Sequence, residues 1–471
     1  MPARDAGVDA FTPTADTGES GPDAFTPTDA SAPDDAATPV DATTPIDASV
    51  PIDAFAPDVG VDAGVPALAT WEASLDASDV GERFGSALSL SADGSRALVS
   101  APFGVGPSGA SGSARVFIRD LGGAWTEEAI LLAPDAEADD RFGQAAALSG
   151  DGRRAIIGAQ TDDTIAGADA GSARIFLRTG ATWTQEAVLL APDGAPNDRL
   201  GFSVSINSDG TVAVVGAVYD DTSAGANAGS VRVFVRSGSA WTQEAALTAA
   251  GGAANDYLGA ALALSDDGGR LLAGAHGDDT LAGADAGSAT VFVRTGTSWS
   301  EEATLVASDG GAGDIFGYGL VSMSADGSRA LVGAGQHDAA GGSDAGTAYV
   351  FVRTGTTWAE EGALVARDGV AMDNFGIGVS LSGDGARAII GANHDARAGF
   401  TDGGSAHLFI REGTRWAEMP ALHHPSPAMG DLFGSAVAIS ADGRTAIVGA
   451  PWDDTARAAN AGSAHVFSVR P

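Results

Sequence analysis

The stretch "GAHGDDTLAGADAGSATVFVR" occupies residues 274–294 and combines an Asp-Asp pair, a glycine-rich loop and an apolar run typical of a β-strand. Close copies stand at 158–178 ("GAQTDDTIAGADAGSARIFLR") and 216–236 ("GAVYDDTSAGANAGSVRVFVR"). A site is usually built once, whereas a pattern written many times is usually architecture. The copies therefore predict a repeat fold, and the sequence around them defines the repeating unit.

Four marks recur from about residue 67 to the C-terminus. Each copy has a tryptophan, a Phe-Gly or Leu-Gly pair, a Gly-Ala or Ser-Ala pair, and a Gly-(Ser/Thr)-(Ala/Val)-x-(Val/Ile/Leu)-Phe string. Successive tryptophans lie 54 to 59 residues apart, at positions 71, 125, 183, 241, 299, 358 and 416. Seven copies of four marks indicate seven structural units.

One copy has the pattern of four antiparallel strands, here called A to D. Strand A follows the Phe-Gly pair with alternating apolar residues (142–149) and reaches an Asp-Gly turn at 151–152, which suits a type I′ hairpin. Strands B, C and D are "RAIIGA" (154–159), "SARIFLR" (172–178) and "WTQEAVLLA" (183–191). No segment shows a sustained 3.6-residue period, so we expect almost no helix.

Seven such units predict an all-β fold, a seven-bladed β-propeller of four-stranded antiparallel blades spanning 67–471. The repeats begin with a lone strand D at 70–76 and end after a strand C at 463–469. A closed ring resolves this mismatch, because the N-terminal strand then completes the last blade and removes an open sheet edge.

Residues 1–66 differ from the repeats in composition. They are rich in Asp, Ala, Thr and Pro, and "DAFTPT" occurs at 9–14 and at 23–28. Such a segment buries too little apolar surface to offset its chain entropy, so we expect a disordered acidic stalk. A spacer role fits this composition, and a binding role of its own is the alternative.

Charge and composition restrict the partners. The chain has 471 residues, with 62 acidic and 25 basic side chains and a formal net charge of −37. A nucleic-acid binder needs a basic face, so nucleic acid is not an expected partner. The sequence has no cysteine, which excludes thiolate chemistry, and no apolar run approaches the about 18–20 residues of a transmembrane helix.

These marks resemble the FG-GAP repeat, the unit of the seven-bladed propeller of integrin α chains and of many bacterial surface and secreted proteins. "FGQAAALSGDGRRAIIGA" (142–159) carries the Phe-Gly pair, the turn and the Gly-Ala pair, and the last copy has "FG" at 433–434 and "GAP" at 449–451. The resemblance covers about 67–471. It implies the fold strongly and the function weakly, because function is grafted onto folds.

The A–B turns depart from the calcium loops that this resemblance implies. The family's calcium-binding blades carry an Asp-x-Asp-x-Asp-Gly type of loop, whereas "SGDGRR" (149–154) offers too few oxygens for the about six to eight that Ca²⁺ takes. We therefore interpret the turn aspartates as turn formers: Asp93, Asp151, Asp209, Asp267, Asp326, Asp384 and Asp442.

Strand directions place the B–C loops and D–A connections on one face, the loop face, and the A–B and C–D hairpins on the other. Most acids fall on the loop face and most arginines on the hairpin face, so we expect an electrically polar ring. An acid also stands two residues before every Phe-Gly or Leu-Gly pair. This recurrence favours bonding to its own backbone over a ring of cation ligands, for Glu82, Asp140, Asp198, Asp256, Asp314, Asp373 and Asp431.

The Asp-Asp pairs of the B–C loops are candidate weak Ca²⁺ sites. Adjacent carboxylates repel unless they are solvated or bridged, and the loops add carbonyl oxygens and, in two copies, a further acid six residues on. The alternative is that these acids are solvated and keep the protein soluble. The candidate ligands are Asp162, Asp163, Asp169, Asp220, Asp221, Asp278, Asp279, Asp285, Asp453 and Asp454.

The two positions after each Gly-Ala pair vary most among the copies and are expected near the central opening. Residues that differ between copies are not needed for the shared fold and can therefore form a specific site. Aromatic faces beside carboxylates suit sugars or cationic side chains. Ligands of the integrin relatives also meet this face. The alternative is that these side chains plug the channel mouth. The candidates are Phe103, Tyr219, His276, His394 and Trp452.

Two other kinds of chemistry have weaker support. The adjacent His423 and His424, together with Asp431, are candidate ligands of a transition metal. The signal is weak, because the sequence pattern fixes no third ligand beside the histidine pair. The sequence shows no nucleophile elbow, zinc-protease motif or cysteine nucleophile. Carboxylates are too numerous for counting to exclude a glycosidase pair, but none is unique.

These features predict a non-enzymatic binding or adhesion protein that acts through its loop face at the cell surface or outside the cell, as a monomer. The alternatives are a lectin-like carbohydrate binder and a carbohydrate-active enzyme. Ca²⁺ is the one candidate cofactor. The N-terminus lacks a signal-peptide pattern, so export requires the hypothesis that Met1 is an internal methionine.

Overall fold

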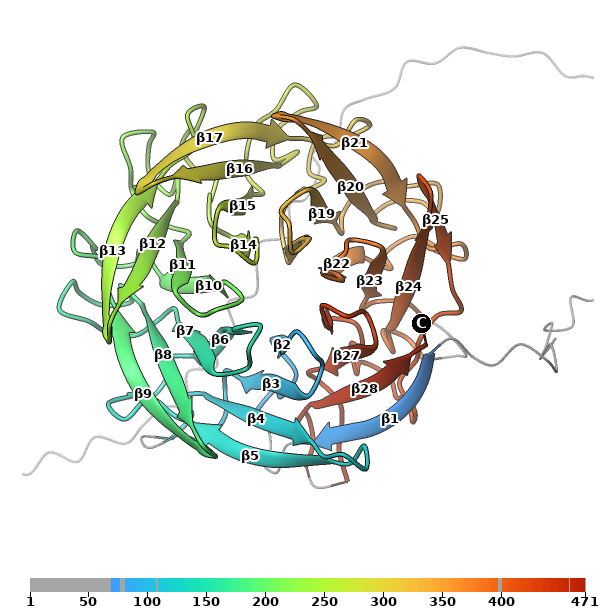
Figure 1. The fold of residues 1–471 in the computed structure, drawn as a ribbon. Coiled ribbons are helices and arrows are strands. Elements are labelled where there is room, and N and C mark those ends of the chain that lie inside the picture. The colour runs from blue at the N-terminus through green and yellow to red at the C-terminus, as the bar shows by residue number, and fades with distance from the viewer. Residues whose placement is uncertain (1–68, 77–80, 107–108, 397–399, 457, 471) are drawn as a thin grey trace, which may run out of the picture. The chain divides into compact units, whose positions relative to one another are not determined.

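The computed structural model describes residues 69–76, 81–106, 109–396, 400–456 and 458–470. These residues form seven four-stranded antiparallel sheets arranged around a centre, and no helix occurs among them (Figure 1). The predicted seven-bladed propeller is therefore confirmed. The predicted stalk at 1–66 lies outside the described residues. Within the described ranges no helix has the length and apolar character that a membrane span needs.

The blades follow one another along the chain, and we number them in that order. Blade 1 has β2 (Leu88–Leu90), β3 (Arg96–Ala101), β4 (Ser113–Arg119) and β5 (Trp125–Leu131). Blade 2 has β6 (Phe142–Leu148), β7 (Arg154–Ala159), β8 (Ser172–Thr179) and β9 (Thr182–Leu189). Blade 3 has β10 (Leu200–Ile206), β11 (Val212–Ala217), β12 (Ser230–Ser237) and β13 (Ala240–Leu247). Blade 4 has β14 (Ala261–Leu264), β15 (Arg270–Ala275), β16 (Ser288–Thr295) and β17 (Ser298–Leu305).

The remaining blades complete the ring. Blade 5 has β18 (Val321–Met323), β19 (Arg329–Ala334), β20 (Thr347–Thr354) and β21 (Thr357–Leu364). Blade 6 has β22 (Phe375–Leu381), β23 (Arg387–Ala392), β24 (Ser405–Glu412) and β25 (Arg415–Glu418). Blade 7 has β26 (Ala436–Ile439), β27 (Thr445–Ala450) and β28 (Ser463–Val469), and its fourth strand is β1 (Ala69–Asp76).

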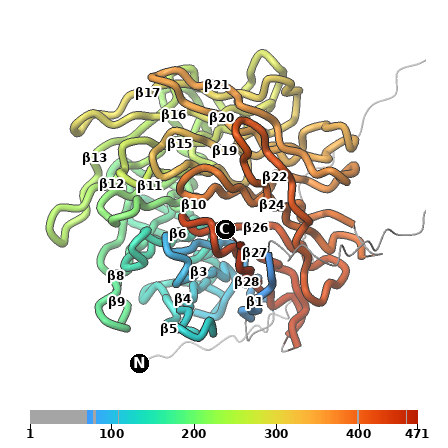
Figure 2. Tube along the Cα trace, turned by 45° about the vertical axis from the view of Figure 1, so that its right-hand side comes forward, coloured from blue at the N-terminus to red at the C-terminus, as the bar shows by residue number. Residues whose placement is uncertain are grey.

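The N-terminal strand closes the ring as predicted. β1 pairs antiparallel with β28, from Ala69 opposite Val469 to Asp76 opposite Ser463, and the two strands lie side by side in both views (Figures 1 and 2). The pairing register of β1 with β28 also corrects the predicted position of the first repeat tryptophan. Leu75 pairs as Leu189 does in blade 2, so Ala69 and not Trp71 takes the place of the repeat tryptophan. Trp71 is 52% exposed for this reason.

The turn aspartates have the role that the sequence predicted. In blade 2 the Asp151 Oδ1 accepts hydrogen bonds from the Ser149 hydroxyl at 2.6 Å and from the Arg153 N–H at 2.9 Å. The predicted type I′ geometry is wrong, because Gly152 has a positive φ of 62° whereas Asp151 does not. The hairpin closes instead through the Gly152 N–H, which donates to the Ser149 carbonyl at 2.8 Å.

The Phe-Gly and Gly-Ala marks are the contact between neighbouring blades. Phe142 is fully buried and belongs to a core cluster that also contains Val116 and Leu131 of blade 1. A Cβ on Gly158 would lie 2.0 Å from the carbonyl oxygen of Gly201 in the next blade. Glycine is required there because two backbones touch, which explains why both glycines recur at constant spacing.

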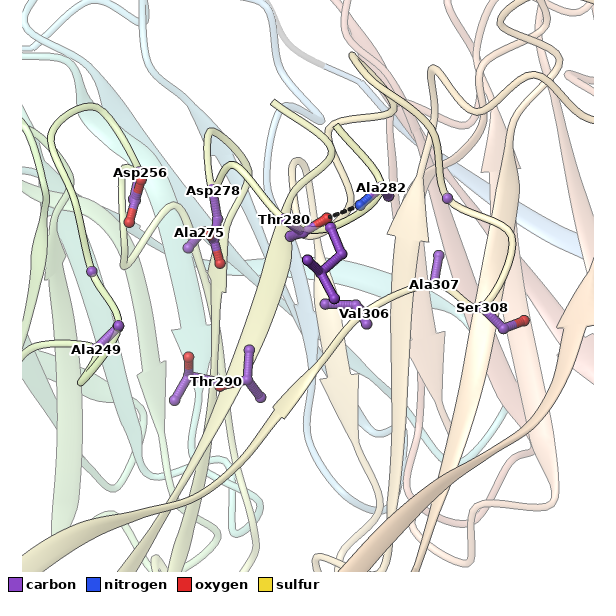
Figure 3. A pocket seen from close by; sticks show the side chains of 15 residues that line it. Ala249, Asp256, Ala275, Asp278, Thr280, Ala282, Thr290, Val306, Ala307 and Ser308 are labelled. Atoms are coloured by element: carbon purple, nitrogen blue, oxygen red, sulfur yellow. Dashed lines mark hydrogen bonds between the residues drawn. The ribbon is translucent and has the colours of Figure 1, made fainter. Parts of the chain in front are cut away.

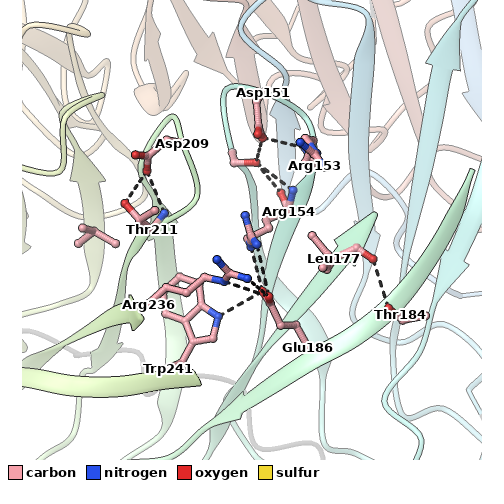
Figure 4. A network of polar contacts seen from close by, with 12 residues as sticks. Asp151, Arg153, Arg154, Leu177, Thr184, Glu186, Asp209, Thr211, Arg236 and Trp241 are labelled. Atoms are coloured by element: carbon pink, nitrogen blue, oxygen red, sulfur yellow. Dashed lines mark hydrogen bonds and ion pairs between the residues drawn. The ribbon is translucent and has the colours of Figure 1, made fainter. Parts of the chain in front are cut away.

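A repeated ion pair joins strand D of one blade to strand C of the next blade (Figure 4). Glu186 of β9 contacts Arg154 of its own blade at 2.8 Å and Arg236 of blade 3 at 2.8 Å, and it accepts a 3.3 Å hydrogen bond from the Trp241 indole. Burial alone would raise the pKa of Glu186, but these donors outweigh it and hold that pKa below its ordinary value. Glu128, Glu244, Glu302 and Glu361 bind an arginine and a tryptophan in the same way.

Candidate site on the loop face

The B–C loops and D–A connections form one continuous surface, as the strand directions predicted. The end of the B–C loop of blade 2 bridges the connection into blade 3, between Gly171 and Leu200, and similar bridges recur around the ring. The Thr161 N–H of the same loop donates to the Asp140 carbonyl at 3.4 Å. Each loop-face surface is thus built by two blades together.

Six of the seven acids that precede the Phe-Gly and Leu-Gly pairs are shown as backbone caps, as their recurrence indicated, and Glu82 contacts the Arg115 guanidinium at 3.2 Å. The Asp140 Oδ2 accepts a 2.6 Å hydrogen bond from the Glu137 N–H, three residues earlier. The same bond recurs at 2.6–2.7 Å for Asp198, Asp256, Asp314, Asp373 and Asp431. Burial raises the pKa of Asp140 to about 6, because the carboxylate loses water and gains only one backbone donor.

The two members of the Asp-Asp pairs in blades 2 and 3 face different partners. The first, Asp162 in blade 2, contacts the guanidinium of Arg174 at 3.0 Å and accepts a hydrogen bond from Ser172. The second, Asp163, accepts a 2.8 Å hydrogen bond from the Asp169 N–H, which closes its own loop. Similar loop-closing bonds are made by Asp221, Asp279, Asp338 and Asp454. Ca²⁺ binding at these pairs stays a prediction.

The space beneath each B–C loop lies at the third residue of strand C, and we call it the strand-C socket. In blade 2 it holds Arg174, which also pairs with Asp135 at 2.7 Å. In blade 3 it holds Arg232, whose two terminal nitrogens contact Asp193 at 2.5 Å and Asp220 at 2.6 Å. Both arginine side chains are only 3% exposed, so each guanidinium is a buried countercharge.

The predicted rim residues lie on the loop face, and the structure adds arginines to them. Arg83 stacks between Trp452 and Phe103, with its guanidinium carbon 4.0 Å and 4.5 Å from the two ring centroids. The guanidinium carbon of Arg141 lies 5.6 Å from the ring centroid of Phe103. We call Trp452, Arg83, Phe103 and Arg141 the tryptophan cluster. It joins blade 7 to blades 1 and 2 across the point where the ring closes.

A second group of planar side chains continues along the rim. Tyr219 lies 4.7 Å from the guanidinium of Arg199 and 5.5 Å from Tyr257. His276 stacks on Tyr257 at 5.0 Å and 13° and meets Tyr318 at 4.9 Å. We call these five residues the tyrosine cluster. Tyr318 also lines a cavity of about 270 Å³ bounded by the first strands of the blades, so the cluster borders the central channel.

The sequence analysis missed the residues that link the predicted ones. Arg83, Arg141, Arg199 and Tyr257 each stand directly before a Phe-Gly or Leu-Gly pair and have a positive φ of 52–59°. This position varies among the copies, which is the signal that would have found it. His394 does not join either cluster, and its Nδ1 lies 3.1 Å from Asp402. Burial lowers the pKa of His276 to about 4, so this ring is neutral at pH 7.

The His-His motif contributes to a buried cluster with a different third member. His424 Nε2 lies 3.3 Å from Asp453 and Nδ1 lies 3.9 Å from Asp431. The third candidate ligand is His465, whose ring centroid is 4.2 Å from that of His424. Burial alone would lower the pKa of His424, but Asp453 outweighs it and raises that pKa. A second group of three candidate ligands is Asp368, His407 and Glu418.

The fold and the loop face define a closed seven-bladed β-propeller made of one repeated unit. Six segments match the model of the FG-GAP repeat, at 125–176, 183–234, 241–292, 299–351, 358–409 and 416–467, and the chain belongs to that family. Each matched segment begins in strand D of one blade and ends in strand C of the next. A comparison with curated proteins found no match.

Two solved structures are similar in fold. A periplasmic gluconolactonase from Pseudomonas aeruginosa is 15% identical with a TM-score of 0.49, and the match covers 73% of this chain and 86% of that one. A Bacteroides uniformis protein described as a 6-phosphogluconolactonase is 11% identical with a TM-score of 0.48, at the same coverages. At these identities the likeness shows the fold alone.

The prediction that this protein is not an enzyme is contradicted by the comparison. That prediction took the lack of a familiar catalytic signature as an exclusion, whereas both similar propellers are described as lactonases. A propeller can carry a catalytic site without a local sequence motif, because side chains from different blades meet only in the folded ring. The exclusion is therefore withdrawn.

Proposed function

We propose that this protein captures a ligand on its loop face, at the edge of the central channel, and that it does so at the cell surface or outside the cell. The observation that carries the proposal is the pair of rim clusters. They gather Trp452, Phe103, Tyr219 and their stacked arginines from separate blades into one partly exposed border. None of these residues belongs to the repeat pattern, so the fold does not require them.

The chemistry of the clusters suits recognition. A guanidinium held flat on an aromatic ring keeps its edge N–H groups free to donate in a fixed plane. Aromatic side chains lose little conformational entropy on binding and present large flat faces, which is why they dominate interface energetics. The acidic loops around the clusters attract cationic partners and steer their approach.

A protein surface is the first candidate ligand and a glycan is the second. The tyrosine cluster favours the glycan, because stacked planar faces such as Tyr257 on His276 suit the apolar face of a sugar ring. Export, which both candidates require, belongs to the same proposal.

The test removes the rim aromatics together in the full chain. The Phe103→Ala, Tyr219→Ala, Trp452→Ala triple variant and the parent protein are applied to immobilised neutral and acidic oligosaccharides and to intact cells. We expect the half-saturating concentration to rise about tenfold or more, since aromatic hot spots carry about 2 kcal/mol each. Loss on the oligosaccharides indicates a glycan, and loss on cells that protease treatment reproduces indicates a protein.

The matched control changes exposed arginines of the hairpin face, Arg153→Ala with Arg444→Ala, and should bind as the parent does. Circular dichroism and the midpoint of thermal unfolding verify that the triple variant is folded. Unchanged binding by a folded triple variant would contradict the proposal.

A further inference from the structure

The strand-C socket is filled by a large side chain in six blades and by a small one in blade 4. The third residue of strand C reads Arg115, Arg174, Arg232, Thr290, Tyr349, His407 and His465 from blade 1 to blade 7. Arginine, tyrosine and histidine each reach the space beneath the B–C loop. Tyr349, for example, donates to Asp309 at 2.8 Å, where Asp309 stands in the place of Asp193. Threonine is too short to do so.

Blade 4 accordingly contains a cavity of about 580 Å³ at this place (Figure 3). Thr290, which is 1% exposed, lies at its base. Asp278 of the B–C loop and Asp256 of the D–A connection line it as well. In sequence position these two acids correspond to Asp220 and Asp198 of blade 3, where Arg232 fills the same space.

The acids of this cavity have lost their countercharge. Within the described ranges no ion pair to Asp256 or Asp278 is found, whereas Asp220 pairs with Arg232 at 2.6 Å. Burial raises the pKa of Asp256, and the nearby Asp278 and Asp279 raise it further without a cation to oppose them. In blade 3 burial also raises the pKa of Asp198, but Arg232 works against the shift. The site therefore keeps Asp278, the counterpart of Asp220, but has Gly251 in place of Asp193 and lacks the guanidinium.

Apart from the hydroxyls of Thr280, Thr304 and Ser308, the other side chains that line the cavity are apolar. Leu281, Val306 and the alanines Ala249, Ala275, Ala282 and Ala307 line it. Val306 is 43% exposed and Leu281 stands fully exposed at the B–C loop, so the cavity opens to solvent beside an apolar surface. A ligand with a cationic planar head and an alkyl chain matches both parts, because its head meets the acids and its chain covers the apolar wall.

We propose that the strand-C socket of blade 4 is a binding site for a ligand that carries an alkylguanidinium group. The ligand head takes the place that Arg232 occupies in blade 3 and hydrogen-bonds to Asp278 at the base of the B–C loop. The planar fork of a guanidinium suits carboxylates better than the point charge of an ammonium. No residue of the rim clusters lines this cavity, and the test of the site does not depend on them.

The experiment is a calorimetric titration of the full chain with propylguanidine, with an acetyl-arginine N-methylamide and with butylamine. We expect one bound guanidinium per chain and binding of butylamine that is about tenfold weaker. Binding by propylguanidine alone identifies a free small molecule as the source, and tighter binding of the capped arginine identifies an arginine side chain of a partner.

Variants of the socket make the test decisive. Thr290→Arg rebuilds the arginine of blades 2 and 3, so we expect binding to fall about a hundredfold or more while the protein stays folded. Asp278→Asn should weaken binding about tenfold, since it removes the charged acceptor. Arg232→Thr opens the same space in blade 3 and should raise the stoichiometry from one to two. Parent-like binding by Thr290→Arg, or no binding by the parent chain, overturns the proposal.

Discussion

Blade 3 and blade 4 are built from the same pattern and differ in what fills the space under their B–C loops. Their third strands, Ser230–Ser237 and Ser288–Thr295, have the same length and the same pattern of buried and exposed positions. Arg232 in the first is a buried countercharge for two acids, and Thr290 in the second leaves a cavity of about 580 Å³. The comparison shows that the recurring residues of the repeat maintain the fold of the blade, whereas the residue in the strand-C socket can differ from blade to blade.

The largest expected effect comes from making blade 3 resemble blade 4. Arg232→Thr leaves Asp193 and the buried Asp220 without their cation, and breaking a buried ion pair by removing one partner costs about 3–5 kcal/mol. We expect the free energy of unfolding, measured by urea denaturation, to fall by that amount. Arg153→Ala, an exposed change on the hairpin face, should stay within about 0.5 kcal/mol of the parent. An equally stable Arg232→Thr would show that the guanidinium is not a countercharge.

A smaller effect should come from blade 7, where His424 provides the positive charge beside Asp453. The folded state raises the pKa of His424, so its contribution to stability is fully present below the unfolded value of about 6.5 and is lost as pH rises through the folded value. Its neighbour His465 has a pKa of about 3 and stays neutral in this window. We therefore expect the free energy of unfolding to decrease from pH 6 to pH 9.

The variant His424→Gln isolates that effect. It should remove the part of the decrease that belongs to this group, which is measured as the difference between the two pH profiles. Parallel profiles for parent and variant would mean that folding does not change the pKa of His424.

The smallest effect is expected from Asp256→Asn in blade 4. The folded state raises the pKa of Asp256, so the stability it contributes is present below the unfolded value of about 3.9 and is lost as pH rises. Asparagine removes the uncompensated charge and can still accept the Ala253 N–H bond. We expect a gain below about 1 kcal/mol at pH 7 that disappears toward pH 4. Asp198→Asn in blade 3, where Arg232 is present, should gain less, and a larger gain there would contradict the comparison.

Much of the fold could be predicted because its determinants are local. Alternating apolar residues, Asp-Gly turns and constant spacing give strands and blade number, and the unpaired strands at the two ends require closure. The same locality made the backbone-capping role of Asp140 predictable, since its donor is three residues away. The type I′ turn and the place of Trp71 were wrong, because φ angles and a two-residue register offset are not fixed by the residue pattern.

The candidate site could be predicted only in part. Phe103, Tyr219 and Trp452 stand out as departures from the repeat, but Arg83 stacks on Trp452 although the two lie at opposite ends of the chain. The sequence likewise did not predict that His465 lies beside His424, nor that blade 4 contains a cavity, because both depend on residues that are distant in the chain. Each depends on which loops of neighbouring blades face one another.

The sequence by itself determined the strand order, the number of blades, the closure by β1 and the positions at which copies depart from their pattern. These follow from turn chemistry and hydrophobic period, which act between near neighbours in the chain. The tertiary structure decided which departures meet, which aspartates receive an arginine and which socket is empty. Those outcomes depend on contacts between residues from 12 to several hundred positions apart, which only the folded blades and the closed ring bring within reach of one another.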